Sequence, residues 1–72
     1  MEEVYIKDEF IKLGQALKLC GAVGSGLEAK IYINEGLVKV NGEECVQRGR
    51  KLYVGDTFEY KGSRYVICTL DH

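Results

Sequence analysis

Apolar residues recur at helical spacing in two segments of the first half of the chain. In the first segment they are separated by three or four residues, which places them on one face of a helix. They are Phe10, Leu13, Leu17 and Cys20. Asp8 stands just before them and is a residue type that commonly caps a helix, so we expect a helix that begins after Asp8 and runs to about Cys20.

The second segment opens with a capping signal. Residues 21–24, Gly-Ala-Val-Gly, interrupt the first periodic segment, and residues 25–28, Ser-Gly-Leu-Glu, form the Ser-x-x-Glu pattern of a capping box. Gly36 suits the left-handed backbone conformation that commonly closes a helix. We therefore expect a second short helix between Ser25 and Gly36.

After this helix the apolar pattern alternates, as it does in a strand. Val38 and Val40 point to one side and Lys39 points to the other. The pair at 41–42, Asn-Gly, is the strongest short signal for a β-hairpin. The partner strand is expected over residues 43–46.

Four further runs favour β-structure because they are rich in β-branched and aromatic residues. They are residues 4–6, 52–54, 57–60 and 64–68. Gly55-Asp56 marks a turn, and Lys61-Gly62-Ser63 joins the last two runs into a closing hairpin. The order of elements predicts a single α+β domain over residues 1–72, with two short helices packed on one side of a small, mostly antiparallel sheet.

The composition excludes several classes of protein. With 72 residues the chain has room for one domain, and none of its apolar stretches approaches the ~20 residues that a membrane span requires. Its acidic start, Met-Glu-Glu-Val-Tyr, differs from a secretory signal, which begins with positive charge. We expect a cytoplasmic protein without membrane contact.

Potential metal ligands and nucleophiles are few and scattered. Three cysteines, Cys20, Cys45 and Cys68, are an odd number at wide separations, which fits neither a disulfide framework nor paired metal ligands. The single histidine, His72, stands at the far end of the sequence, so the usual ligand or base of a metal site or catalytic triad is lacking. We expect no catalytic residue, no metal, no cofactor and no small-molecule substrate.

The charge of the chain is unevenly distributed. The net charge of −1 argues against a nucleic-acid-binding protein, because neutralised phosphates supply most sequence-independent affinity. Residues 1–9, however, hold four acids and one lysine, whereas residues 10–51 hold seven Lys or Arg against four Glu. The middle of the chain is therefore basic.

An ordered set of residues between positions 10 and 60 carries a family resemblance. The set consists of Lys12-Leu13 and Leu17, then Ser25, Ala29 and Ile33, then Gly36, Val38, Val40 and Asn41-Gly42, and finally Gly55-Asp56. In this order and spacing the chain resembles the S-four RNA-binding domain, whose two helices and β-hairpin form the alpha-L motif. The resemblance implies an RNA-binding protein that catalyses no reaction. We expect it to be a monomer and to recognise structured RNA by backbone shape and charge.

Other residues resemble one branch of that family. Lys30, Asn41-Gly42 and residues 47–53 look like the small stand-alone bacterial members, which are implicated in ribosome maturation or ribosome association. The resemblance thus implies ribosomal RNA or ribosomal particles as the partner.

Two positions depart from the common family pattern. Many members have Arg-Leu-Asp where this chain has Lys12-Leu13-Gly14, and Val54 replaces a proline that often precedes Gly-Asp. Lysine keeps the positive charge of arginine but lacks its two-pronged donor geometry. The departures leave open which RNA is bound.

The start of the second helix is the first candidate phosphate site. Unpaired N–H groups and a partial positive charge gather there, and Gly24 and Gly26 would let a phosphate approach closely. The Ser25 hydroxyl is available as a helix cap, as a phosphate contact, or as both. Lys30 and Asn34, four residues apart, can face the same ligand, although Lys30 can instead pair with a surface glutamate.

The connection over residues 47–51, Gln-Arg-Gly-Arg-Lys, is the second candidate. Its two arginines suit phosphate oxygens, while a simple solvated loop is the alternative. Lysines from the first helix and the hairpin can extend this patch, or be ordinary solvated side chains. The complete predicted RNA-binding set is Lys12, Lys18, Ser25, Gly26, Lys30, Asn34, Lys39, Asn41, Gln47, Arg48, Arg50 and Lys51.

The aromatic residues do not predict base-specific reading. The chain has no Trp, and its five tyrosines are spread out without the clustered platform that stacks single-stranded bases. A different function is a protein-interaction adaptor that uses the sheet face around Tyr60, Tyr65 and Val66, which the net negative charge favours. Salt-sensitive RNA binding distinguishes the two functions.

Overall fold

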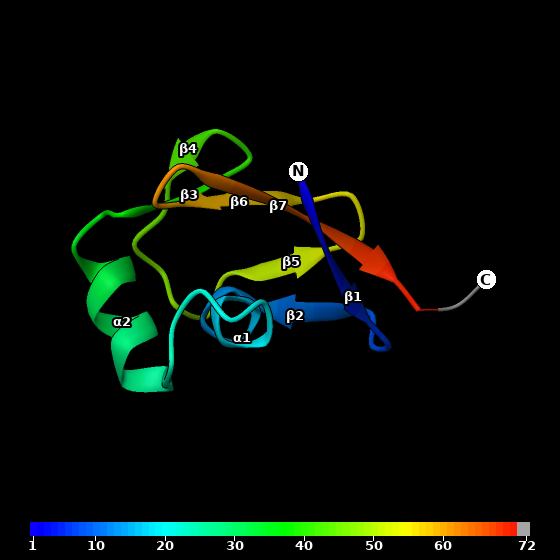
Figure 1. The fold of residues 1–72 in the computed structure, drawn as a ribbon, viewed down its shortest axis with the longest axis horizontal. Coiled ribbons are helices and arrows are strands. Elements are labelled where there is room, and N and C mark those ends of the chain that lie inside the picture. The colour runs from blue at the N-terminus through cyan, green and yellow to red at the C-terminus, as the bar shows by residue number, and fades with distance from the viewer. Residues whose placement is uncertain (71–72) are drawn as a thin grey trace.

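The computed structural model describes residues 1–70, in which two helices accompany seven short strands (Figure 1). In chain order these elements are β1 (Glu2–Ile6), β2 (Phe10–Lys12), α1 (Leu13–Leu19), α2 (Gly26–Asn34), β3 (Val38–Val40), β4 (Glu43–Glu44), β5 (Lys51–Tyr53), β6 (Thr57–Tyr60) and β7 (Ser63–Thr69). No helix within residues 1–70 is long and apolar enough to cross a membrane.

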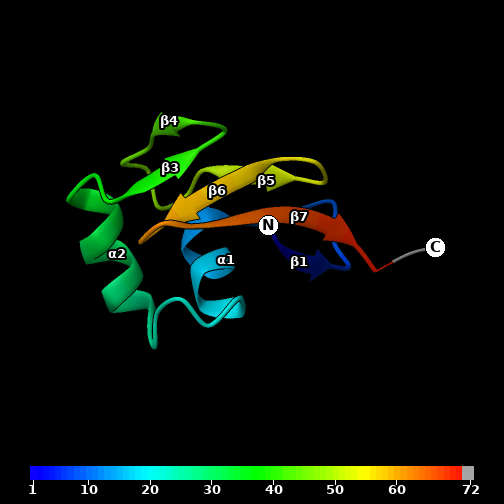
Figure 2. The same cartoon turned by 45° about the horizontal axis from the view of Figure 1, so that its top comes forward.

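The strands form two sheets. Five strands lie in the order β1-β7-β6-β3-β4, with β1 parallel to β7 and every other pair antiparallel. Strands β2 and β5 form a separate antiparallel pair. Both helices lie on the same side of the five-stranded sheet (Figures 1 and 2). The predicted α+β arrangement of two helices on a mostly antiparallel sheet is thereby confirmed.

The core lies between the helices and this sheet. Val38 and Val40 of β3 face the core while Lys39 faces solvent, as the alternating pattern predicts. The side chains that are fully buried come from the helices, from the five-stranded sheet and from β5. The largest are Phe58, Leu13, Leu17, Ile33, Leu52, Ile67 and Val38.

The second helix begins and ends as predicted. Ser25 Oγ accepts the N–H of Glu28 at 3.2 Å, and the Glu28 carboxylate accepts the N–H of Gly24 at 2.9 Å. Gly36 closes the helix with a φ of 77°.

The first helix begins later than predicted. Residues Phe10–Lys12 are strand β2, and the helix begins at Leu13 with no side-chain cap, so Asp8 does not cap it. Phe10 lies opposite Tyr53 in the β2–β5 pair, with the ring centroids 5.9 Å apart. The helical spacing gave a wrong start for the helix because Phe10 packs against Tyr53 across the β2–β5 pair and does not lie on a helix face.

Several strand boundaries also differ from the prediction. The strand expected over residues 43–46 is only Glu43–Glu44, because Cys45 turns into the core. The strand expected over 52–54 is Lys51–Tyr53. Strands β1 and β7 are longer than the predicted runs, because they pair with each other in parallel along five positions.

The cysteines within residues 1–70 are free thiols, and His72 lies outside the described residues. Cys45 is buried, while Cys20 and Cys68 are half-buried. Burial raises the pKa of the Cys20 thiol and of the nearby Tyr65 phenol, because both lose contact with water.

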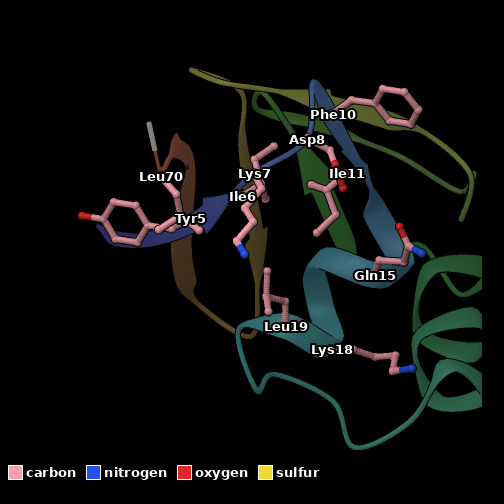
Figure 3. Close-up of a pocket in the computed structure, with 10 residues that line it drawn as sticks. All are labelled: Tyr5, Ile6, Lys7, Asp8, Phe10, Ile11, Gln15, Lys18, Leu19 and Leu70. Carbon is pink, nitrogen blue, oxygen red and sulfur yellow. The ribbon is translucent and has the colours of Figure 1, made fainter. Parts of the chain in front are cut away.

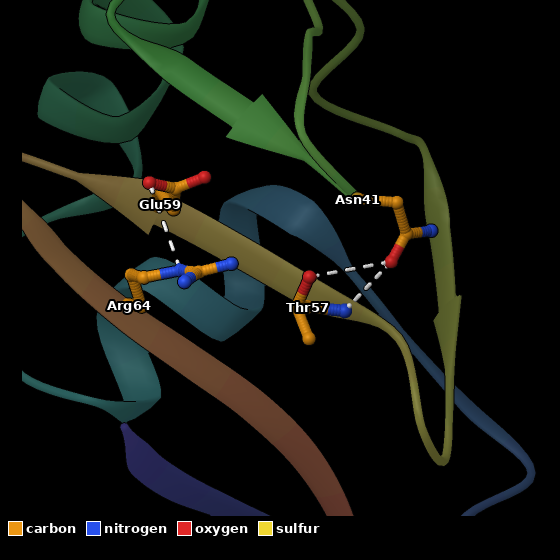
Figure 4. A network of polar contacts seen from close by, with 4 residues as sticks. All are labelled: Asn41, Thr57, Glu59 and Arg64. Carbon is orange, nitrogen blue, oxygen red and sulfur yellow. Dashed lines mark hydrogen bonds and ion pairs between the residues drawn. The ribbon is translucent and has the colours of Figure 1, made fainter.

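A network around Asn41 joins the two turns at one end of the sheet (Figure 4). Asn41 has a φ of 50°, and its Oδ1 accepts the Thr57 N–H at 2.9 Å and the Thr57 hydroxyl at 3.4 Å. Its Nδ2 donates to Asp56 Oδ1 at 3.3 Å. Asp56 in turn accepts the Tyr53 N–H at 2.8 Å. Asn41 thus fixes the β3–β4 turn against the β5–β6 turn.

Replacing Asn41 by alanine should destabilise the fold by about 1–2 kcal/mol, because the hydrogen bonds are lost and alanine tolerates a positive φ poorly. Urea unfolding measures the change. Asn34→Ala, an exposed asparagine at the end of α2, is the control and should alter the free energy of unfolding by less than about 0.5 kcal/mol. Equal effects of the two substitutions would contradict the network.

The raised pKa values predict a loss of stability at alkaline pH. Cysteine and tyrosine in an unfolded chain ionise near about 8.5 and 10, and both groups ionise at higher pH in the folded protein. Their stabilising contribution is complete below about pH 8.5 and is lost as the pH rises through the folded-state values. Urea unfolding across this range should show the decline, and Cys20→Ala should delay its onset. A constant free energy of unfolding in the wild type would refute the effect.

Candidate nucleic-acid interface

The basic connection is bound to the first turn of α1 by two backbone hydrogen bonds. Leu13 N donates to Arg50 O at 2.9 Å, and Gly14 N donates to Arg48 O at 3.1 Å. The first N–H groups of a helix have no partner inside the helix. Here the carbonyls of the connection take the place of the absent side-chain cap.

Gly14 permits this close approach. The residue is buried, and a Cβ at this position would lie 2.8 Å from Arg48 Cγ. In the sequence this glycine is evident only as a departure from the family pattern, and its packing role becomes apparent in the fold. A glycine within a predicted helix is itself a signal of a packing or functional requirement.

Three cations from separate segments meet in a hollow of about 280 Å³. Lys12 comes from the end of β2, Lys18 from the last turn of α1 and Arg48 from the connection. The other lining residues are Gly14, Gln15, Gly26 and Gly49. None of the described lining residues is acidic. We call this site the basic hollow, and its unmatched positive charge and small neutral walls suit a phosphate group.

The start of α2 contributes less to the hollow than predicted. Gly26 lines it, but the Ser25 hydroxyl already accepts a hydrogen bond from the Glu28 N–H, as a helix cap does. The serine retains its own proton for donation. The Glu28 carboxylate also occupies the Gly24 N–H. Of the two possible roles for Ser25, the structure shows the cap.

Lys30 and Asn34 lie exposed on α2, outside the lining of the basic hollow. Within residues 1–70 the ion pair is that of Arg64 with Glu59, at 3.8 Å, so Lys30 is not paired with a glutamate.

The rest of the connection points elsewhere. Gln47 and Arg50 line a second hollow of about 260 Å³, which Glu43 and Glu44 also line. Lys51 Nζ lies 4.7 Å from the centroid of the Phe10 ring, a cation–π arrangement. Of the three cations in the connection, Arg48 alone lines the basic hollow.

Lys39 and Asn41 are also separated from the basic hollow. Lys39 lies opposite Glu44 on one neighbouring strand and Glu59 on the other. Glu59 lies opposite Arg64 and pairs with it (Figure 4). These four side chains form an outer row of alternating charge on the sheet face away from the helices. The Asn41 amide is engaged in the turn network described above.

The sheet face expected for a protein adaptor is absent. Tyr60 and Tyr65 are 3% and 7% exposed and belong to the core, where burial against the helices removes them from any partner. Val66, between the buried positions of β7, is half-buried.

Comparison with known proteins gives a consistent result. The family model described as S4 domain matches residues 4–68. The curated protein "Probable ribosome maturation protein RlbA" of Bacillus subtilis (strain 168) is 49% identical over 59 residues, which cover 82% of this chain and 83% of the relative.

A solved structure shares the fold. The solution structure of YbcJ from E. coli superposes with a TM-score of 0.72 at 33% sequence identity, covering 94% of this chain and 87% of that one. That structure is described as revealing an ALFAL motif involved in RNA-binding.

Two matched glycine substitutions test the contact between α1 and the connection. Gly14→Ala should lower the free energy of unfolding by about 1 kcal/mol, because its Cβ would displace the Arg48 stem. Gly26→Ala, at the start of α2, has no atom within 4 Å of its new Cβ and should stabilise by about 0.4–1 kcal/mol. Urea unfolding compares the two, and equal stabilisation would show that Gly14 does not contact Arg48.

Proposed function

Since this chain belongs to the S4 domain family, we propose that it binds structured RNA at the basic hollow and acts in ribosome maturation or on the ribosome. The proposal is for binding without catalysis, and it places the protein in the cytoplasm. The name of the Bacillus subtilis relative supports the ribosomal role, and the description of YbcJ supports the binding of RNA.

The convergence of Lys12, Lys18 and Arg48 is the observation that carries the proposal. Each of these cations lies on a different segment, and the hollow they share has no acidic lining residue. By contrast, Lys39 and Arg64 face glutamates across the outer row. Cations without an acidic neighbour attract phosphate, while the charge of cations beside glutamates is largely neutralised.

The geometry favours recognition of the RNA backbone. The hollow presents charged side chains and small residues, which suit phosphates of a structured RNA and carry little information about base identity. Lys30 and Asn34 on the exposed surface of α2 would meet the same RNA beyond Gly26. The net charge of −1 suits a factor that binds transiently more than a permanent ribosomal component.

A pair of charge-matched variants tests the proposal. Lys12→Gln with Arg48→Gln removes two cations from the basic hollow, and Lys39→Gln with Arg64→Gln removes two from the outer row. Binding to structured ribosomal RNA fragments is measured over a salt series. The first variant should bind more weakly and flatten the dependence of log K on log salt by about one to two, since it loses up to two phosphate contacts.

The outer-row variant serves as the control and should keep the wild-type slope, although its net charge changes equally. Equal losses in both variants would show that overall charge, and not the basic hollow, governs binding. If the folded wild type binds no RNA at low salt, the RNA proposal fails and a protein partner takes its place.

A further inference from the structure

A groove of about 550 Å³ with both apolar and polar lining residues lies beside the basic hollow (Figure 3). Ile6, Ile11 and Leu19 form its middle. Tyr5 and Leu70 lie on one side (Figure 3). Leu19 is 57% exposed and Tyr5 is 45% exposed, so this apolar surface faces solvent.

The groove and the basic hollow adjoin each other along α1. Gln15 and Lys18 of α1 line both of them. A ligand that places a phosphate in the basic hollow can therefore extend along α1, past Lys18, into the groove.

The chemistry of the groove suits a nucleobase. A base has two apolar faces and an edge of hydrogen-bond donors and acceptors. The aliphatic side chains of Ile11 and Leu19 match the faces, and the Gln15 amide offers both a donor and an acceptor to the edge.

The size of the groove argues against a protein occupant. A stable protein interface engages roughly 20–30 residues on each side. Ten residues line this groove, and its volume lies within the range of about 300–1,000 Å³ that small ligands occupy. The charged residues that line the groove are Lys7, Asp8 and Lys18, and their net positive charge suits a nucleotide better than an apolar peptide.

We propose that the groove holds the base of one unpaired nucleotide in the RNA whose backbone lies in the basic hollow. Ile11 and Leu19 contact the faces of the base, and Gln15 contacts its edge. This inference rests on the proposed function and adds to it a site for a single unstacked base, which backbone recognition alone does not require.

The experiment compares two hairpin RNAs that differ only in whether one bulged nucleotide carries a base. One carries a single bulged adenosine, and the other carries an abasic nucleotide at the same position. Each is titrated into the whole chain at low salt and followed by NMR. The adenosine hairpin should bind about five-fold more tightly, the lower end of what contact with the face of one base contributes. The methyl signals of Leu19 and Leu70 should shift with adenosine alone.

Two leucine variants complete the design. Leu19→Gln should abolish the difference between the two hairpins. Leu37→Gln replaces a leucine of similar exposure, 50% against 57%, that lies outside the groove, and should preserve the difference.

The outcomes separate the two proposals. If both hairpins bind equally and shift Lys18 and Arg48 but not Leu19, the basic hollow stands and the base site is wrong. If neither hairpin binds, the proposed function itself fails. If the Leu19 and Leu70 signals shift when the protein alone is concentrated, a second copy covers the groove, and this too overturns the base site.

Discussion

The contact between the first turn of α1 and the backbone of the basic connection supports both partners. A seven-residue helix without a side-chain cap is too short to persist alone in water. The residues of the connection before Lys51 are not part of a strand and have no strand-to-strand hydrogen bonds. When Leu13 and Gly14 donate to the carbonyls of Arg50 and Arg48, each segment supplies what the other lacks. The position of the Arg48 side chain, and with it the basic hollow, follows from this contact.

Charge in this protein is separated by face. On the outer face of the sheet, Lys39 and Arg64 alternate with glutamates, so their fields largely cancel at short range. Around α1, the cations of the basic hollow have no such partners. A chain with a net charge of −1 can thus present a local positive potential. The total charge predicts solubility and association in general, but the strand register decides which cations remain available.

Elements with local signals were predictable from the sequence, and contacts between distant segments were not. The capping box at Ser25 and the Asn-Gly turn at 41–42 can be recognised from a few consecutive residues. Strand β2 depends on a partner far along the chain, so Phe10 was assigned to a helix. The candidate site has the same limit: the basic residues were identified individually, but the separation of Lys39 from Arg48 required the fold.

The parallel pairing of β1 with β7 has a consequence for the order in which the chain folds during synthesis. Val4 and Ile6 lie in a strand made early, yet their partner strand is made late. Until β7 has been synthesised, β1 lacks the strand that lies beside it in the five-stranded sheet, whereas α2 and the β3–β4 hairpin need contacts closer in sequence. The apolar side chains of Val4 and Ile6 therefore stay without their sheet neighbours until the end of the chain has been made.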